Sequence, residues 1–228
     1  MELTVLGCFG PYPAAGGHAT SGYLLKENGS RLILDMGAGT LTRLLQHTDI
    51  SSIDAVYISH LHFDHTSDLL PLRYLLDDLG VTLNVITHRE DSPWYDTLFS
   101  HPRFNIISAD ENTAVKAGNL SLSFYKMKHP AENYAVKIKG EKTFFYTGDT
   151  VYCDALVPAA AGSDMILADC CKHADFKGPH MTCADAIRLC KETGSPLIAT
   201  HLAPGYEPGG DFDGYDIRVA REGETYSF

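Results

Sequence analysis

The sequence is poor in the features that mark exported, membrane-embedded and nucleic-acid-coating proteins. No run approaches the roughly 18 apolar residues of a membrane-spanning helix, and residues 1–6 lack the basic segment and cleavage site of a secretory signal. Lys and Arg number 18 against 29 Asp and Glu, so the net charge is −11 and broad electrostatic binding of nucleic acid is disfavoured. We therefore expect a cytoplasmic protein that makes no membrane contact and little extended contact with nucleic acid.

The six cysteines contain no CxxC pattern, so free thiols are the simplest interpretation in a reducing compartment. Cys183 and Cys190 recur with Ala186 and Ile187 at the spacing of one helical face, which predicts small core residues. The sequence also lacks a low-complexity segment, a solenoid repeat and a GxxxxGK[ST] phosphate loop. These absences exclude a repeat protein and a phosphate-loop nucleotide-binding protein.

Strand-like and helix-like segments alternate along the chain. Apolar runs bounded by Gly, Asp, Asn and Pro predict strands over 2–7, 20–26, 31–35, 54–59, 81–87, 120–127, 133–139, 142–147, 164–169 and 196–200. Helical periodicity predicts helices over 40–47, 66–79, 93–100 and 182–193. In the last, Thr182 and Asp185 form a capping-box-like start, and Gly194 is placed to end the helix. Together these patterns predict two sheets faced by helices in one domain, residues 1–228.

The segment His60-Leu61-His62-Phe63-Asp64-His65 places four potential metal ligands within six residues, directly after a predicted strand. Imidazole and carboxylate together suit Zn²⁺, Mn²⁺ or Fe²⁺. At about 100° per residue these side chains would scatter around a helix, so we expect a loop at the strand end. The alternative, a set of solvated loop histidines, fits so dense a cluster less well.

Three more candidate ligands each follow a predicted strand: His129, Asp149 and His201. If those strands end at one rim, five His and two Asp come together, which is more than one ion needs. Seven ligands fit two ions about 3.5–4 Å apart that are bridged by one carboxylate and polarise a water. We therefore expect two divalent ions, with zinc as the first choice and manganese or iron as alternatives. The other histidines without ligand partners in sequence, expected mostly at the surface, are His47, His88, His101 and His173.

This set of motifs resembles the metallo-β-lactamase superfamily of αββα hydrolases. The matching motifs, which agree in order and rough spacing, are HxHxDH at 60–65, His129, Thr147-Gly148-Asp149-Thr150 and His201. The Gly-Asp-Thr sequence, the early Gly-rich loop and the helix start at His180-Met181-Thr182 are similar to ribonuclease Z-like proteins and their small phosphodiesterase relatives. The resemblance implies an α+β fold of four layers, αββα, in which two mixed β-sheets are flanked by helices.

The resemblance also implies a role for each residue. The expected ligands are His60, His62 and His129 for the first ion, Asp64, His65 and His201 for the second, and Asp149 as the bridge. His180 matches a histidine that assists protonation of the leaving group, and Asp169 matches a carboxylate that orients it. A histidine that only caps or packs at the helix start is the alternative for His180. Asp64, His180 and Asp169 are thus the expected catalytic residues.

Departures from the family narrow the expected function. Ribonuclease Z carries a long tRNA-gripping arm between the positions that match His129 and Asp149, but only 19 residues separate them here. The β-lactamases carry a cysteine at the position of Asp149, and flavodiiron proteins carry Glu at that of His62. We therefore expect neither tRNA processing, antibiotic hydrolysis nor flavodiiron chemistry.

The expected activity is metal-dependent hydrolysis of a phosphodiester, either a small cyclic or nucleotide-like ester or a short RNA. Hydrolysis of a carboxylic ester, thioester or lactone is the first alternative, and a non-catalytic metal-binding protein is the second. Lys and Arg near the metals would favour phosphate, whereas an apolar rim of Tyr12, Tyr23, Phe63 and Tyr206 would favour an acyl group. The expected partners are small molecules or short oligonucleotides, and a homodimer is left open.

Overall fold

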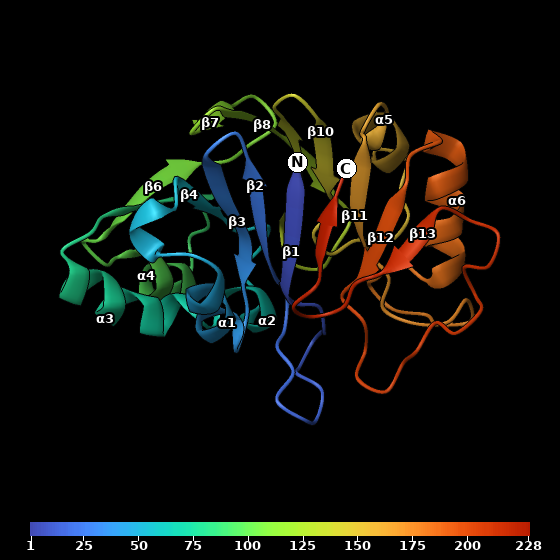
Figure 1. Ribbon diagram of the computed structural model, residues 1–228, viewed down its shortest axis with the longest axis horizontal. Helices are drawn as coiled ribbons and strands as arrows, with labels where there is room; N and C mark the ends of the chain where they lie inside the picture. Colours follow the sequence, from blue (N-terminus) through green and yellow to red (C-terminus); the bar gives the residue numbers. More distant parts are fainter.

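Two seven-stranded β-sheets pack face to face in the computed structural model, which describes residues 1–228 (Figure 1). The first sheet has the order β14-β1-β2-β3-β4-β5-β6, with β1 (Glu2–Gly7), β2 (Gly22–Glu27), β3 (Ser30–Met36), β4 (Ala55–Tyr57), β5 (Leu83–Thr87), β6 (Phe104–Ser108) and β14 (Thr225–Ser227). The second has the order β13-β12-β11-β10-β9-β8-β7, with β7 (Ala114–Ala117), β8 (Leu120–Met127), β9 (Asn133–Lys139), β10 (Thr143–Tyr146), β11 (Met165–Asp169), β12 (Leu197–Thr200) and β13 (Ile217–Val219). Both sheets mix parallel and antiparallel pairs.

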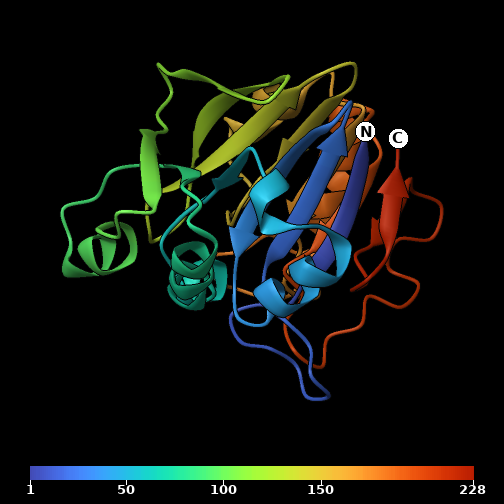
Figure 2. The same cartoon turned by 60° about the vertical axis from the view of Figure 1, so that its left-hand side comes forward.

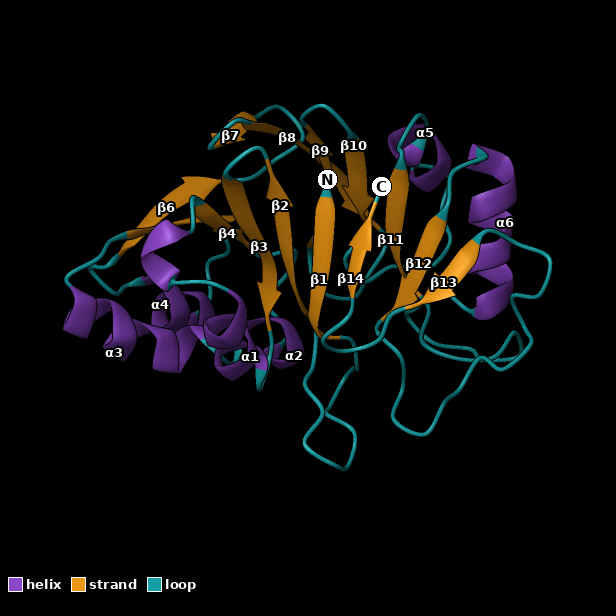
Figure 3. Cartoon of the chain, in the orientation of Figure 1, coloured by secondary structure: helices purple, strands orange, loops and turns teal.

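Helices cover the outer face of each sheet (Figure 3). The first sheet carries α1 (Thr40–His47), α2 (Phe63–Thr66), α3 (Leu69–Leu79) and α4 (Pro93–Phe99), and the second carries α5 (Leu156–Ala160) and α6 (Cys183–Thr193). A short 3₁₀ helix over Ile50–Ser52 leads into β4. None of these helices is long and apolar enough to span a membrane. The four-layer αββα architecture predicted from the sequence is confirmed.

Alternation along the strands divides the apolar side chains among three layers. Leu32 and Leu34 of β3 face the second sheet in a core of 25 buried residues, while Ile33 between them packs against the helices of the first sheet. Successive strand residues point to opposite faces, so one apolar strand can fill two layers. A third layer joins the second sheet to α5 and α6 and contains Cys183 and Cys190, as their helical spacing predicts.

The chain termini meet at the edge of the first sheet. The ammonium group of Met1 donates to the carbonyl oxygen of Phe228 at 3.1 Å, and both ends lie side by side in the two views (Figures 1 and 2). The Gly-rich segment between β1 and β2 extends as a loop beyond the strand ends in both views. At the base of this loop Glu222 accepts from the backbone N–H of Ala19 at 2.6 Å and pairs with Arg43 at 2.5 Å.

All ten predicted strands and the helices at 40–47, 93–100 and 182–193 are present with ends shifted by a few residues at most. The capping box of α6 is present, with Thr182 and Asp185 each accepting from the backbone N–H of the other. The elements that lie outside the predicted ranges are β6, β7, α5, β13, β14 and the short 3₁₀ helix. Each of these elements has only three to five residues, which gives a weak periodic signal in the sequence.

The helix predicted over 66–79 is wrong at its start. The structure has the short helix α2 and then α3, separated by Ser67 and Asp68. The backbone N–H of Asp68 donates to the carbonyl oxygen of Met36 at 2.9 Å, and its carboxylate accepts from the N–H of Leu41 at 2.8 Å. These contacts with the end of β3 and the first turn of α1 interrupt the helix. Asp64 and His65 consequently lie on a single helical turn rather than in an open loop.

Candidate metal centre

The candidate site lies at one edge of the sandwich because the parallel strands of both sheets end there. In the first sheet β3, β4 and β5 run parallel, and in the second β10, β11 and β12 run parallel. The carboxyl ends of parallel strands meet at one edge, where ligand sites of such sheets form. The segment 58–65 follows β4, Asp149 follows β10, and His201 follows β12. The edge therefore collects residues from distant parts of the chain.

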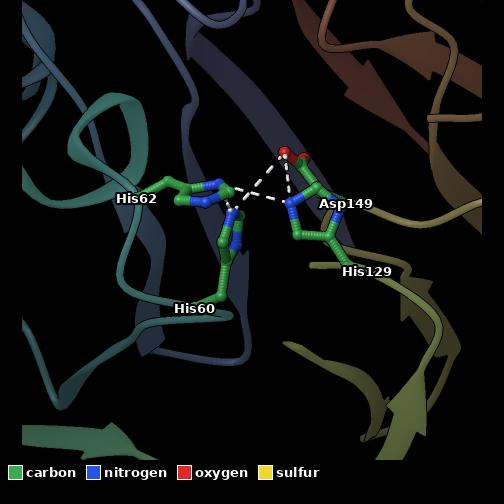
Figure 4. Close-up of side chains that lie close together, drawn as sticks. All are labelled: His60, His62, His129 and Asp149. Atoms are coloured by element: carbon green, nitrogen blue, oxygen red, sulfur yellow. Dashed lines mark hydrogen bonds and ion pairs between the residues drawn. The ribbon is translucent and has the colours of Figure 1, made fainter. Parts of the chain in front are cut away.

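The first donor set consists of His60, His62, His129 and Asp149, whose ligand atoms lie within 4.8 Å of one another. Figure 4 shows the three imidazoles and the carboxylate directed toward a common point. The Nδ1 of His62 is 2.9 Å from the Nε2 of His60 and 3.2 Å from the Nε2 of His129. Oδ2 of Asp149 is 3.6 Å from the Nε2 of His60 and 3.9 Å from that of His129.

The second donor set consists of Asp64, His65, His201 and again Asp149. The Nε2 of His201 lies 3.1 Å from Oδ2 of Asp64 and 3.2 Å from Oδ2 of Asp149. The Nε2 of His65 lies 3.6 Å from Oδ2 of Asp64 and 3.3 Å from Oδ1 of Asp149. The structure thus brings together all seven predicted ligands, with Asp149 shared between the two sets.

Both sets fit divalent ions. Ligand atoms about 2.0–2.1 Å from one tetrahedral ion lie about 3.3–3.4 Å apart, which matches the separations in each set. In the first set three imidazole nitrogens face one another, an arrangement that a shared cation stabilises. In the second, the buried Nε2 of His65 and Oδ1 of Asp149 have no hydrogen-bond partner. Buried polar atoms without partners are costly, and an ion between them would satisfy both.

The electrostatics of the two sets differ. Burial lowers the pKa of His60 well below its ordinary value and the pKa of His129 to about 4, so these rings are held in the neutral, metal-binding form. Burial also acts to lower the pKa of His65 and His201, but the facing carboxylates, chiefly Asp149, outweigh it and raise both pKa values well above the ordinary value. A divalent ion in the second set would therefore displace protons on binding.

Asp35, at the end of β3, is a site residue that the sequence analysis missed. Its buried carboxylate accepts from the Nδ1–H of His65 at 2.7 Å, the hydroxyl of Tyr146 at 2.6 Å, and both the hydroxyl and the backbone N–H of Ser59 at 2.8 and 2.7 Å. This contact selects the tautomer that leaves the Nε2 of His65 free for a metal. The signal was present, because Asp35 ends a predicted strand just as Asp149 follows one.

The predicted pair of His180 and Asp169 also lies beside the donor sets. The Nδ1 of His180 is 3.0 Å from Oδ2 of Asp169, and its ring stacks on that of His201 with centroids 4.8 Å apart. Burial opposes the charged form of His180, but its hydrogen bond and ion pair with Asp169 raise its pKa. His180 is partly exposed, with 12% of its side chain accessible, and can therefore exchange a proton with a bound molecule.

Special backbone positions hold the ligands in place. Gly148 has φ +56°, and a Cβ there would lie 2.3 Å from Oδ1 of Asn133, whose amide donates to the carbonyl oxygens of Thr147 and Asp149. His201 itself has φ +57°. Positive φ is unfavourable for a residue with a Cβ and at functional sites persists only where the surroundings enforce it. The two ligand-bearing loops after β10 and β12 of the second sheet are thus tightly constrained.

Several predicted positions differ in the structure. Tyr23, expected on the rim, is fully buried between the sheets, and Tyr206 is also buried. Tyr12 and Phe63 are exposed by 60% and 67%, in agreement with a rim position. His88, expected at the surface, is 3% exposed. It directly follows β5, and its ring packs against that of Tyr134 with centroids 5.9 Å apart. Burial of this side chain could not be read from its local sequence.

Comparison with known proteins identifies the family. Residues 30–202 match the model of the Beta-lactamase superfamily domain. The chain belongs to this superfamily. Within it, the probable metallo-hydrolase YhfI of Bacillus subtilis is 33% identical over 213 residues, which cover 89% of this chain and 87% of that protein. A ribonuclease Z of Saccharolobus islandicus is 24% identical, with 81% of this chain and 83% of that protein covered.

Solved structures of the superfamily show the same fold. The crystal structure of the metallo-β-lactamase fold protein YhfI from B. subtilis superposes with a TM-score of 0.91 at 30% identity and covers 99% of each chain. The short form of human tRNase Z superposes with a TM-score of 0.80 at 19% identity, and the match covers 100% of this chain and 99% of that one. A diphosphatase of the PhnP family superposes with a TM-score of 0.79 at 17% identity, and the match covers 100% of this chain and 97% of that one. The superfamily and fold inferred from the motifs are confirmed: the protein is a metallo-hydrolase of this superfamily, and its sequence is similar to that of ribonuclease Z.

Proposed function

We propose that residues 1–228 form one hydrolase domain that uses two divalent ions to hydrolyse a phosphodiester. The observation that carries the proposal is the pair of donor sets that share Asp149, with the His180–Asp169 pair beside them. The proposed ligands are His60, His62 and His129 for one ion, Asp64, His65 and His201 for the other, and Asp149 for both. Zinc is the first choice because of the imidazole-rich set, with manganese or iron as alternatives.

Two such ions, when bound, supply an activated water near neutral pH and neutralise the charge that develops on the substrate. The residues of the chain do the rest. The carboxylate of Asp64, held by His201 at 3.1 Å, orients the attacking water. His180, aligned by Asp169, delivers a proton to the departing oxygen, and its raised pKa keeps that proton available near neutral pH.

Two observations support a small phosphodiester substrate. Relatives and fold neighbours include a ribonuclease Z and a PhnP-family diphosphatase, enzymes whose names indicate phosphate esters or anhydrides. The interval between His129 and Asp149 is filled by β9 and β10 with a turn of three residues between them, 140–142, which leaves no room for a tRNA-gripping arm. A small cyclic or nucleotide-like ester, or a short RNA, therefore fits better than a folded tRNA.

Hydrolysis of a carboxylic ester, thioester or lactone is the second candidate. It is favoured by the exposed aromatic side chain of Phe63, which directly follows His62 and packs edge-on against Trp94 with centroids 4.9 Å apart. An exposed aromatic surface next to a ligand suits an apolar acyl group. Tyr12, on the Gly-rich loop, adds a second exposed ring.

The test combines metal content with turnover of bis(p-nitrophenyl) phosphate, a cyclic nucleotide and p-nitrophenyl acetate in the presence of Zn²⁺ or Mn²⁺. We expect about two ions per chain and phosphodiester turnover that is abolished in Asp64→Ala while the fold survives. His180→Gln should reduce kcat by about 10²–10⁴-fold and leave metal content unchanged. Turnover of acetate alone would favour the acyl candidate, and full activity of Asp64→Ala would refute the scheme.

A further inference from the structure

Three fully buried tyrosines, Tyr23, Tyr57 and Tyr146, are the largest side chains of the interior. They belong to the otherwise apolar layer between the two sheets. A hydroxyl buried in an apolar layer costs free energy unless it is hydrogen-bonded, so its partner shows what the residue does. In all three cases that partner belongs to the opposite sheet.

Tyr146 ends β10 of the second sheet and donates to Oδ2 of Asp35, on β3 of the first sheet, at 2.6 Å. Tyr23 lies on β2 of the first sheet, and its hydroxyl is 2.6 Å from Oγ1 of Thr200, which ends β12 of the second. The two rings also touch edge-on, with centroids 5.5 Å apart. These two tyrosines form one polar connection across the core.

Both bridges lead directly to residues of the second donor set. Asp35, which accepts from Tyr146, also accepts from the Nδ1–H of His65 at 2.7 Å. Tyr146 precedes Asp149 by three residues, and Thr200 directly precedes His201. Each hydrogen bond therefore joins a segment that carries a candidate ligand to the opposite sheet.

The second donor set is the one that needs such a connection. Asp64 and His65 come from the segment after β4 of the first sheet, whereas Asp149 and His201 follow strands of the second. Apolar contacts between sheets are non-directional, so they do not align particular atoms of one sheet with particular atoms of the other. Hydrogen bonds have a narrow range of length, so two of them beside the ligands set the separation of the two half-sites.

We propose that Tyr146 and Tyr23 are positioning residues that set the distance between the two halves of the second metal site. The inference rests on the proposed dinuclear function. Tyr226 provides a matched control, because its hydroxyl also crosses between the sheets, from β14 to the carbonyl oxygen of Val219 on β13 at 3.0 Å. That bridge joins edge strands and contacts no residue of either donor set.

The experiment compares Tyr146→Phe, Tyr23→Phe and Tyr226→Phe, each of which removes one hydroxyl and keeps the ring. Metal-free proteins are titrated with Zn²⁺ against a chromophoric chelator, and the thermal midpoints of the metal-free forms are recorded. We expect the Zn²⁺ equivalent that fills the second donor set to bind about 10- to 100-fold more weakly in Tyr146→Phe and Tyr23→Phe. The other equivalent should bind as in the wild type, and Tyr226→Phe should bind both ions like the wild type despite a lowered thermal midpoint.

Each outcome separates this inference from the function on which it rests. If the wild type binds two ions and Tyr146→Phe and Tyr23→Phe bind both of them as tightly as the wild type does, the inference is wrong and the proposed function stands. An equal loss in Tyr226→Phe would also overturn it, because the effect would then follow from general loosening of the sandwich. If the wild type binds fewer than two ions, the dinuclear function fails and this inference fails with it.

Discussion

Replacement of Asp35 by Asn is the sharpest single test of how the metal centre is held. The carboxylate of Asp35 is fully buried and receives four hydrogen bonds, from His65, Tyr146 and twice from Ser59. All four partners are donors. Asn has the same shape, but half of its amide is an NH₂ group that can only donate. In either orientation the amide therefore places a donor against a donor.

The expected magnitude follows from the distribution of these contacts. Three donors reach Oδ2 and one, the N–H of Ser59, reaches Oδ1. The better orientation of the new amide in Asp35→Asn keeps the three and leaves the N–H of Ser59 unpaired. A hydrogen bond to a charged group contributes about 1.5–3 kcal/mol against about 0.5–1.5 for a neutral one. The three remaining bonds each weaken by about 1–1.5 kcal/mol and the unpaired N–H costs about 1–3 kcal/mol, so we expect the free energy of unfolding to fall by about 4–7 kcal/mol.

The same change should weaken metal binding, because the carboxylate that fixes the tautomer of His65 is gone. Loss of such a partner costs about 10- to 100-fold in affinity, or about 1.4–2.7 kcal/mol. Urea denaturation of the metal-free protein measures the loss in free energy of unfolding, and Zn²⁺ titration against a chelator measures the loss in metal affinity. Asp54→Asn is the control, since Asp54 accepts from the N–H of Arg31 at 2.7 Å just before the opposite end of β4. Wild-type Zn²⁺ affinity in Asp35→Asn, or an equal loss in Asp54→Asn, would refute the reasoning.

Two further predictions follow from the backbone and from burial. Gly148→Ala should lower the free energy of unfolding by about 1–2 kcal/mol because of the positive φ, and by more because the new Cβ clashes with Asn133. The variant should also bind less metal. Gly162→Ala, with φ +73° and open space around it, should lose stability but keep its metal; equal metal content in both variants would contradict this account. Burial lowers the pKa of His88 in the folded protein, whereas in the unfolded chain its pKa is about 6.5. Below pH 6.5 the unfolded chain therefore binds a proton that the folded protein does not, and the free energy of unfolding falls until the pH drops below the pKa of the folded state. His88→Phe should flatten this acid-side decline in urea midpoints, and an unchanged pH profile would show that another group causes it.

The sequence by itself determined the ligand chemistry and the fold family. Imidazole and carboxylate groups in HxHxDH at 60–65, together with His129, Asp149 and His201 just after apolar runs, indicated a metal centre before any contact was known. Position relative to a strand is a local property, and the end of a parallel strand lies at a predictable edge. The α6 boundaries were predictable for the same reason, since its caps lie within a few residues of the helix.

Only the tertiary structure decided which distant side chains support those ligands. Asp35 and Tyr146 are 111 residues apart, and no periodicity connects them. The sequence pattern of Tyr23 is equally compatible with a rim and a core position, and that of His88 with surface and interior. Packing of one sheet on the other chose between them, because burial depends on what covers a residue and not on its neighbours in the chain. The ligands were therefore readable from the sequence, whereas the network that holds them at working distances required the two sheets to meet.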